Sequence, residues 1–196
     1  HAAPAPAPHR PSCVLLYNPK GVYESSLGLG GPGDNLGIGE SKPATCCPTA
    51  GTVANSWDPG LARAMGQALG EEARSLGVNM VLGPGMNIKR NPLCGRNFEY
   101  YSEDPQVAGR MAAGLIEGIQ SQKVAATPKH FAMNSQELRR QASNSIVDER
   151  TMRELYLTGF EIAVRQARPW ALMTSYNMIN GEYANENSHL LKDILR

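Results

Sequence analysis

The sequence predicts an α/β fold in which helices cover a parallel sheet, and three observations support this prediction. Segments with apolar residues at helical spacing alternate with short apolar segments. The short segments show no alternation of polar and apolar residues, which is typical of strands buried on both faces. An aspartate that can cap a helix stands at the start of three helical segments. Both an open doubly wound sheet and a closed (β/α)8 barrel fit this pattern.

The first helix–strand unit lies between residues 58 and 85. The predicted helix begins at Asp58, and Pro59 takes the first helical position, where its missing N–H is no loss. Gly77 can end this helix, because glycine is common directly after a helix. Residues 78–82 follow as a short buried strand, which ends at the glycine-proline turn of residues 83–85.

The same unit repeats along the chain. The second helix begins at Asp104, and a strand is expected over residues 124–127. The third helix begins at Asp148, and its strand is expected over residues 170–174. A fourth helix is expected from about Asn187 to the chain end. These units belong to one predicted domain, residues 43–196.

Residues 1–42 are expected to form an irregular leader with a glycine-rich segment. Residues 1–11 alternate Ala and Pro and lack the apolar centre of a signal peptide. The glycines of residues 28–39 could cradle a phosphate in a nucleotide-dependent α/β enzyme. That hypothesis needs a preceding strand and an acidic residue on the following strand, and neither is evident. A glycine loop without a phosphate is the preferred interpretation.

Composition and charge argue against two classes of partner. The net charge is +1 and there is no long basic run, whereas nucleic-acid binders usually carry a basic patch. No apolar stretch approaches the roughly 20 residues needed to cross a bilayer. We therefore expect neither a nucleic-acid nor a membrane partner, and a cytoplasmic and a secreted location both remain open.

The cysteines and histidines indicate neither a metal nor a cofactor. The four cysteines form no CxxC pair, and the four histidines are scattered along the chain. Free thiols are expected, although Cys46 or Cys47 could bridge to Cys94 in an oxidising compartment.

Polar side chains follow the three predicted strands. Arg96 lies in the long loop after the first strand, Lys129 and His130 follow the second, and Tyr176 follows the third. The carboxyl ends of parallel strands meet at one edge, where ligands bind in both candidate architectures. Several hydrogen-bond donors together with aromatic faces suit a polyhydroxylated ligand such as a sugar.

Each of these residues also has a purely structural interpretation. Arg96 could form an ion pair with Glu99 or Glu103, and Lys129 and His130 could simply cap the end of a strand. Considered one at a time, the structural interpretations are favoured. Polar groups at three separate strand ends favour a binding site.

Five segments resemble the family 3 glycoside hydrolases, especially their β-glucosidase members. They are residues 43–49, 82–88, 91–105, 129–131 and 175–181. The run over residues 94–99 with the motif over residues 102–105 is highly specific, whereas the short run 129–131 alone would be weak. The likeness covers roughly residues 43–196.

The resemblance implies part of a (β/α)8 TIM-type barrel with parallel strands and outer helices. It also implies hydrolysis of terminal β-linked glucose by a retaining mechanism, in which an Asp attacks the anomeric carbon and a Glu serves as acid and then base. By motif match, Arg96, Lys129 and His130 would bind sugar hydroxyls, and Met173 would line the same pocket. Tyr176 would lie close to the nucleophile and the ring oxygen. The implied partner is a β-glucoside or an oligosaccharide substrate.

The chain departs from the family pattern in three respects. The nucleophile Asp is expected on a strand beyond Arg196, so no residue here matches it. The early motif that supplies a sugar-binding Asp has its nearest match at residues 29–33, with Gly30 where the Asp belongs. The acid/base residue is expected from a following domain.

Two functions therefore stand beside each other: a hydrolase of the β-glucosidase type, and a non-catalytic sugar-binding fragment that lacks the nucleophile and the acid/base. If the chain hydrolyses glycosides alone, another carboxylate must act, and the candidates are Glu99, Glu103, Asp148, Glu149 and Glu182. An incomplete barrel leaves sheet edges uncovered. We accordingly expect a homo-oligomer, a rearranged sheet, a missing second domain or marginal stability.

Overall fold

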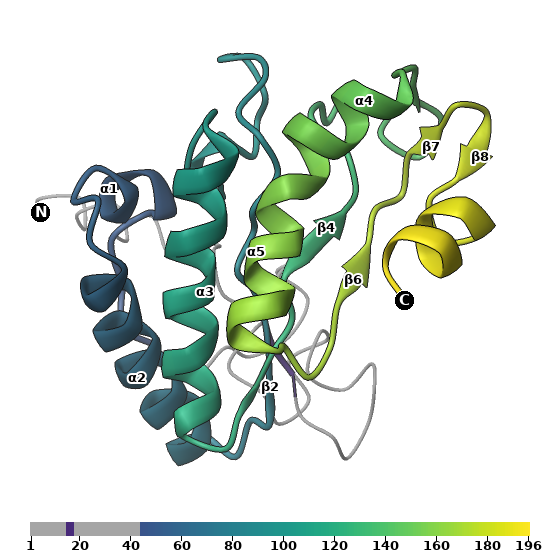
Figure 1. The fold of residues 1–196 in the computed structure, drawn as a ribbon. Coiled ribbons are helices and arrows are strands. Elements are labelled where there is room, and N and C mark those ends of the chain that lie inside the picture. Colours follow the sequence, from purple (N-terminus) through teal and green to yellow (C-terminus); the bar gives the residue numbers. More distant parts are fainter. Residues whose placement is uncertain (1–14, 18–43) are drawn as a thin grey trace, which may run out of the picture.

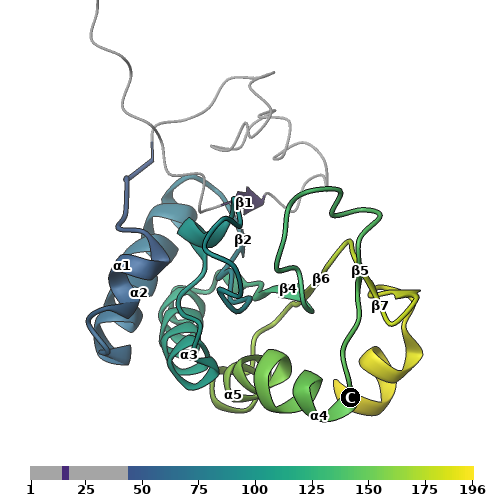
Figure 2. The same ribbon diagram turned by 90° about the horizontal axis from the view of Figure 1, so that it is seen from above.

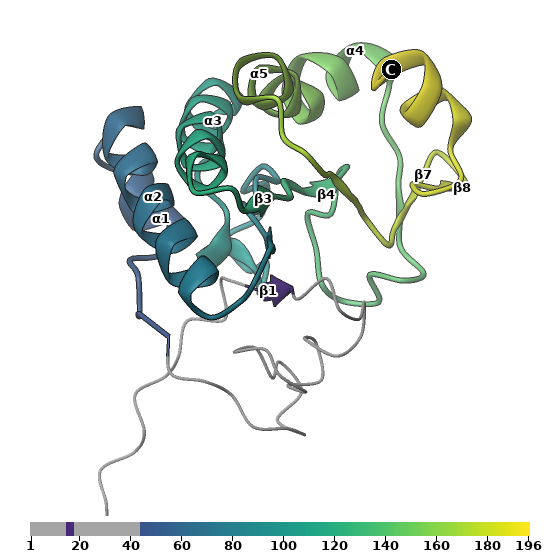
Figure 3. The same ribbon diagram turned by 90° about the horizontal axis from the view of Figure 1, so that it is seen from below.

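The computed structural model describes residues 15–17 and 44–196. Its helices form an arc around the strands, with α3 packed between α2 and α5 (Figures 1, 2 and 3). The helical segments are α1 (Ala50–Ala54), α2 (Pro59–Ser75), η1 (Asn97–Glu99), α3 (Pro105–Ser121), α4 (Glu149–Thr151), η2 (Met152–Leu157), α5 (Thr158–Ala167) and η3 (His189–Ile194). Apart from residues 15–17, the predictions for residues 1–42 lie outside the described residues.

All three aspartate caps that the sequence predicts are confirmed. Asp58 accepts a hydrogen bond from the backbone N of Gly60 at 2.8 Å, and Asp104 accepts one from Val107 at 2.9 Å. The carboxylate of Asp148 accepts from the backbone N of Thr151 at 3.0 Å. These bonds satisfy N–H groups that the first helical turn leaves without a partner.

The third and fourth predicted helices differ from a regular α-helix. After Asp148 the chain runs through α4, the π-helical segment η2 and α5 without a break. The fourth helix, η3, is a short π-helical segment, and Asn187 accepts a hydrogen bond from the backbone N of Leu190 at 2.9 Å. The sequence thus predicted where these helices begin, whereas the hydrogen-bond register inside them was not predicted.

The strands form three small sheets rather than one closed barrel within the described residues. Their bounds are β1 (Leu15–Tyr17), β2 (Met80–Leu82), β3 (Ala125–Ala126), β4 (Lys129–Phe131), β5 (Asn144–Ser145), β6 (Met173–Thr174), β7 (Met178–Ile179) and β8 (Glu182–Tyr183). The pairs β2–β3, β4–β6 and β5–β7 are parallel. Parallel pairing was expected for the predicted strands, whereas β5 and β7 were not predicted. The pairs β1–β2 and β7–β8 are antiparallel and were not predicted. The fold is therefore a mixed α/β structure with parallel strands.

Lys129 and His130 lie within strand β4, not after the end of a strand as the sequence suggested. Backbone hydrogen bonds continue past β2 and β3: Lys129 N donates to the oxygen of Pro84 at 2.9 Å, and Met86 N donates to the oxygen of Lys129 at 2.7 Å. These bonds extend the strand pairing beyond Pro128, which has no N–H to contribute. The position of both side chains is consequently set by the sheet.

Helices α2 and α3 approach closely because glycines face each other at their contact. A Cβ atom added at Gly118 would lie 2.2 Å from the backbone oxygen of Arg63, and one added at Gly66 would lie 2.4 Å from that of Leu115. Side chains at these positions would hold the helices apart. The close contact buries Ala62 and Ile119 completely. The two helices pack against strands β2 and β3.

No helix among the described residues is long and apolar enough to span a membrane. The expectation of free thiols is confirmed for Cys46, Cys47 and Cys94. Cys13 lies outside the described residues.

Candidate functional site

A buried carboxylate brings two of the predicted sugar-binding residues together. Glu99 ends the short segment η1, and the guanidinium of Arg96, three residues earlier, donates to its Oε1. The ammonium of Lys129, from strand β4, lies 3.1 Å from Oε2 of Glu99. The side chains of Glu99 and Lys129 are only 3% and 1% exposed. The ion pair between Arg96 and Glu99 that the sequence allowed is confirmed, and Lys129 extends it.

His130, the next residue of β4, is also buried. The backbone N of His130 donates to Asn87 Oδ1 at 2.9 Å, and Asn87 Nδ2 donates back to the oxygen of His130 at 2.9 Å. The ring nitrogen Nδ1 lies 3.3 Å from the hydroxyl of Tyr100. Asn87 on the loop after β2 and Tyr100 after η1 therefore orient this imidazole.

The environment of His130 keeps the ring neutral. Burial, followed by the positive charges of Arg96, Lys129 and Arg140, lowers the pKa of His130 to about 2. Burial also raises the pKa of the Tyr100 hydroxyl. Both groups can exchange hydrogen bonds at neutral pH, but neither carries a charge there.

A chain of polar side chains leads from Tyr100 toward the molecular surface. Asn134 donates to the hydroxyl of Tyr100 at 3.5 Å and to Oε1 of Glu137 at 3.1 Å. The other oxygen of Glu137 accepts from Arg140 at 3.0 Å. The guanidinium of Arg140 stacks over the ring of Tyr176, with its carbon 5.2 Å from the ring centroid.

The five predicted site residues are gathered to different degrees. Arg96 and Lys129 share one carboxylate, His130 follows Lys129 directly, and Met173 of β6 is the register partner of Lys129. Tyr176 is 60% exposed, and its contact with the group runs through Arg140 and the polar chain. Four of the five thus lie around strand β4, and Tyr176 stands at the outer edge.

Sequence reasoning missed Asn87, Tyr100, Asn134 and Arg140. The first two stand inside the segments that carry the family resemblance, so their place next to Arg96 in those segments was a usable signal. For Asn134 and Arg140 no such signal existed, because their partners are set by the path of the loop that follows β4.

The proposed substitute carboxylates, apart from Glu99, lie away from this cluster. Asp148 caps α4, Glu149 pairs with Arg153 and His189, and Glu182 is exposed on β8. Glu103 lines a polar cavity beside α1. The structure therefore places Glu99, and none of the other four, within reach of both Arg96 and Lys129.

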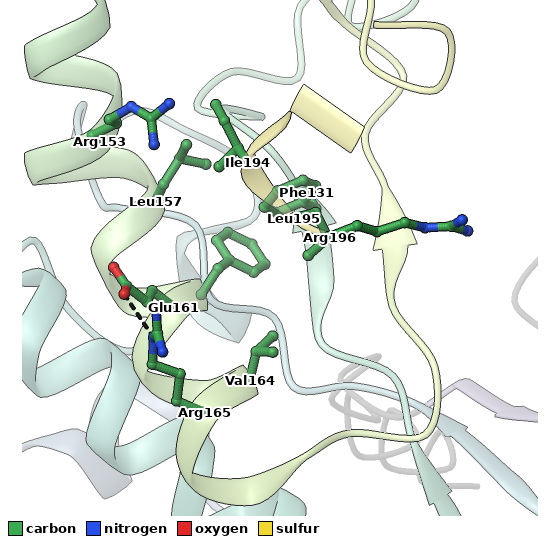
Figure 4. A pocket seen from close by; sticks show the side chains of 10 residues that line it. Phe131, Arg153, Leu157, Glu161, Val164, Arg165, Ile194, Leu195 and Arg196 are labelled. Atoms are coloured by element: carbon green, nitrogen blue, oxygen red, sulfur yellow. Dashed lines mark hydrogen bonds and ion pairs between the residues drawn. The ribbon is translucent and has the colours of Figure 1, made fainter. Parts of the chain in front are cut away.

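The cavity in Figure 4, which both apolar and charged side chains line, is separate from the proposed sugar-binding residues. Its volume is about 430 Å³, and it lies between α5 and the C-terminal residues. Phe131 of β4 and Phe160 of α5 meet edge to face at its wall, with ring centroids 5.1 Å apart. The other lining residues are Arg153, Leu157, Glu161, Val164, Arg165, Ile194, Leu195 and Arg196. Among the residues that the structure describes, no three His, Cys, Asp or Glu side chains are grouped so as to hold a metal ion.

Comparisons with known proteins identify a family and several relatives. Residues 34–196 match the N-terminal domain of glycosyl hydrolase family 3. The chain is 48% identical over 196 residues to the thermostable beta-glucosidase B of Acetivibrio thermocellus, covering all of this chain and 25% of that protein. It is 45% identical over 186 residues to an exo-alpha-(1->6)-L-arabinopyranosidase of Bifidobacterium longum, covering 95% of this chain and 24% of that protein.

A solved structure shows the same fold over most of the chain. Beta-glucosidase 3B from Thermotoga neapolitana, in complex with alpha-D-glucose, superposes with a TM-score of 0.79 and 48% sequence identity. The match covers 84% of this chain and 23% of that chain. The present chain thus spans about a quarter of the length of the relatives it matches.

Proposed function

The chain belongs to glycosyl hydrolase family 3, and from this premise we propose that it provides the sugar-binding part of a β-glucosidase-type hydrolase. The proposed reaction removes terminal β-linked glucose from glucosides or short oligosaccharides by a retaining mechanism. The observation that carries the proposal is the meeting of Arg96, Lys129 and His130 from two separate chain segments around strand β4. All three stand in segments that resemble the family.

The chemistry of this group suits a sugar. The guanidinium and the ammonium donate hydrogen bonds to hydroxyl oxygens. Nδ1 of the neutral His130 faces Tyr100 and Asn87, so its Nε2 is left to donate or accept one hydrogen bond. Met173, beside Lys129 in the sheet, offers an apolar surface, and the exposed ring of Tyr176 can lie against the C–H face of a sugar. Hydrogen bonds from these donors that strengthen as an oxocarbenium-like transition state forms would also favour the reaction.

A second candidate function is sugar binding without hydrolysis. It is favoured for this chain alone because the carboxylates near the site are held in ion pairs. A glycosidase needs two carboxyl groups, roughly 5 Å apart for retention or 6.5–9.5 Å apart for inversion. Glu99 and Glu137, which lie nearest the cationic cluster, are each engaged by an arginine. A carboxylate held in this way is poorly placed to attack a sugar or to carry its proton.

Two measurements on the purified chain distinguish these functions. Glucose binding is followed by titration calorimetry, and hydrolysis by aryl aglycone release from a β-D-glucopyranoside and an α-L-arabinopyranoside. We expect glucose to bind, and Lys129→Met to weaken binding about tenfold or more, because a donor and its charge are lost. Lys192→Met, which removes an exposed lysine of η3, is the matched control and should bind as the parent does.

The outcomes separate the two candidates. Aglycone release that is lost in Lys129→Ala and in His130→Ala supports a hydrolase, and the preferred glycoside identifies the sugar. Binding without release supports the non-catalytic function. Aglycone release that survives both alanine substitutions would refute the proposed site.

A further inference from the structure

We propose that Glu99 is a positioning residue that fixes the charged ends of Arg96 and Lys129 for sugar binding. This inference rests on the proposed function, because it assumes that both cations contact the sugar. It adds a residue whose role is exerted through other side chains. Glu99 itself is not proposed to touch the ligand.

The backbone around Glu99 is built for this contact. Its N–H donates to the oxygen of Arg96 at 3.1 Å, so one tight turn places both side chains on the same side. Gly85, bridged to Lys129 in the sheet, lies directly against this turn. A Cβ atom at Gly85 would lie 3.0 Å from the backbone oxygen of Glu99 and 3.1 Å from its Cγ. Glycine at this position lets the carboxylate reach the strand that carries Lys129.

Electrostatics explain why a carboxylate is needed between the two cations. Arg96 and Lys129 carry like charges, and Lys129 is almost completely removed from water. Without a counter-charge, burial and repulsion would both disfavour the charged form of the amine. Oε1 faces Arg96 and Oε2 faces Lys129, so each oxygen of Glu99 serves one cation. The pair is thereby neutralised in part and held at a set spacing.

The same geometry argues against Glu99 as a substitute nucleophile. Both of its oxygens are engaged by cations, and the residue is 3% exposed. Attack on an anomeric carbon requires an oxygen that faces the sugar ring. Arg96, by contrast, has a 19% exposed side chain and further N–H groups beyond those directed at Glu99. It is therefore the arginine, positioned by Glu99, that can reach a ligand.

A double-mutant cycle on glucose binding tests this role. We expect Glu99→Gln to weaken glucose binding about tenfold or more, since the isosteric amide removes the charge that aligns the cations. Lys129→Met should weaken binding at least as much. If Glu99 acts through its partners, the double variant should lose less than the product of the two single losses, because in the absence of Lys129 only the positioning of Arg96 is left to lose. Glu154→Gln, which removes the carboxylate of an exposed ion pair with Arg150, is the control and should bind as the parent does.

A second readout does not depend on the ligand. The Arg96 Nε–H, directed at Glu99, should give a slowly exchanging NMR signal in the parent and in Glu154→Gln, and this signal should be lost in Glu99→Gln. Glu99→Asp keeps the charge on a shorter side chain. It should retain the fold and bind glucose more weakly, which tests the same point if Glu99→Gln does not fold.

Each result decides the inference. Unchanged binding in Glu99→Gln, multiplicative losses in the double variant, or an unaffected Arg96 signal would each overturn it. Absence of glucose binding in the parent would instead refute the proposed function, and the Arg96 signal would still report whether Glu99 fixes the guanidinium. The two failures are thus distinguishable.

Discussion

His130 is predicted to make the folded chain lose stability as the pH falls below neutrality. Burial, and then the charges of Arg96, Lys129 and Arg140, lower the pKa of this imidazole from 6.5 to about 2. Between these two values the unfolded chain binds a proton at His130 and the folded chain does not. Stability is therefore complete above pH 6.5 and falls at lower pH.

The magnitude follows from the size of the pKa shift. Each pH unit within the window costs about 1.4 kcal/mol, because one more proton is bound by the unfolded chain. Lowering the pH from 8 to 5 crosses about 1.5 units of the window, so His130 alone should remove about 2 kcal/mol. That is a large part of the about 5–15 kcal/mol by which a domain is usually stable.

Urea unfolding at pH 8, 6.5 and 5 measures this effect in the parent and in His130→Asn. The variant keeps a polar group near the position of Nδ1 and removes the titration, so its stability should depend less on pH by about 2 kcal/mol. His189 serves as an internal comparison, because its pKa is shifted the other way. Hydrogen bonds to Asp193 and then Glu149 raise the pKa of this imidazole. The contribution of His189 is complete below pH 6.5 and is lost as the pH rises through its folded pKa, which is the opposite direction. Equal pH dependence in the parent and in His130→Asn would refute the reasoning.

Three further predictions concern folding and assembly. Gly118→Ala should destabilise the chain by about 1–3 kcal/mol in urea unfolding, because its Cβ would lie 2.2 Å from the oxygen of Arg63 and the clash outweighs the better helix propensity; an unchanged midpoint would mean that α2 and α3 can separate easily. Asp104→Ala should cost about 1 kcal/mol, since the N–H of Val107 loses its capping partner, and a loss below the measurement error would show that water replaces the cap. The chain should sediment as a dimer or larger species that Val164→Glu dissociates, because the cavity beside α5 is lined in part by the apolar side chains of Leu157 and Val164, which a second chain can cover; a compact, stable monomer would contradict this.

Local sequence signals predicted the beginnings of the helices and the parallel pairing well. Asp58, Asp104 and Asp148 cap their helices through hydrogen bonds to residues two or three positions away. These contacts depend on neighbouring residues alone, so the sequence can predict them. The short strands β5, β7 and β8 were not predicted. Their pairing depends on where a distant loop and the chain after Tyr176 come together, and short segments of this kind carry no clear period.

The candidate site was predicted as a set of residue types and not as a set of contacts. Motif resemblance selected Arg96, Lys129, His130, Met173 and Tyr176, and their roles toward a sugar remain a proposal. Glu99 was considered as a partner of Arg96 and as a substitute catalyst, yet its ion pair with Lys129 could not be predicted across a separation of 30 positions. The contact between Arg140 and Tyr176 likewise joins two loops that no local pattern relates.

By itself the sequence determined where the helices after Asp58, Asp104 and Asp148 begin and which family the chain resembles, because these features depend on neighbouring residues and on short motifs. The short segments α1 and η1 were not predicted. Only the tertiary structure decided that strand β4 carries Lys129 to the carboxylate of Glu99, that His130 is buried beside three positive charges, and that the described strands do not close into a barrel. The physical reason is that charge pairing, burial and sheet closure depend on distances through space, and these are set when remote segments pack together.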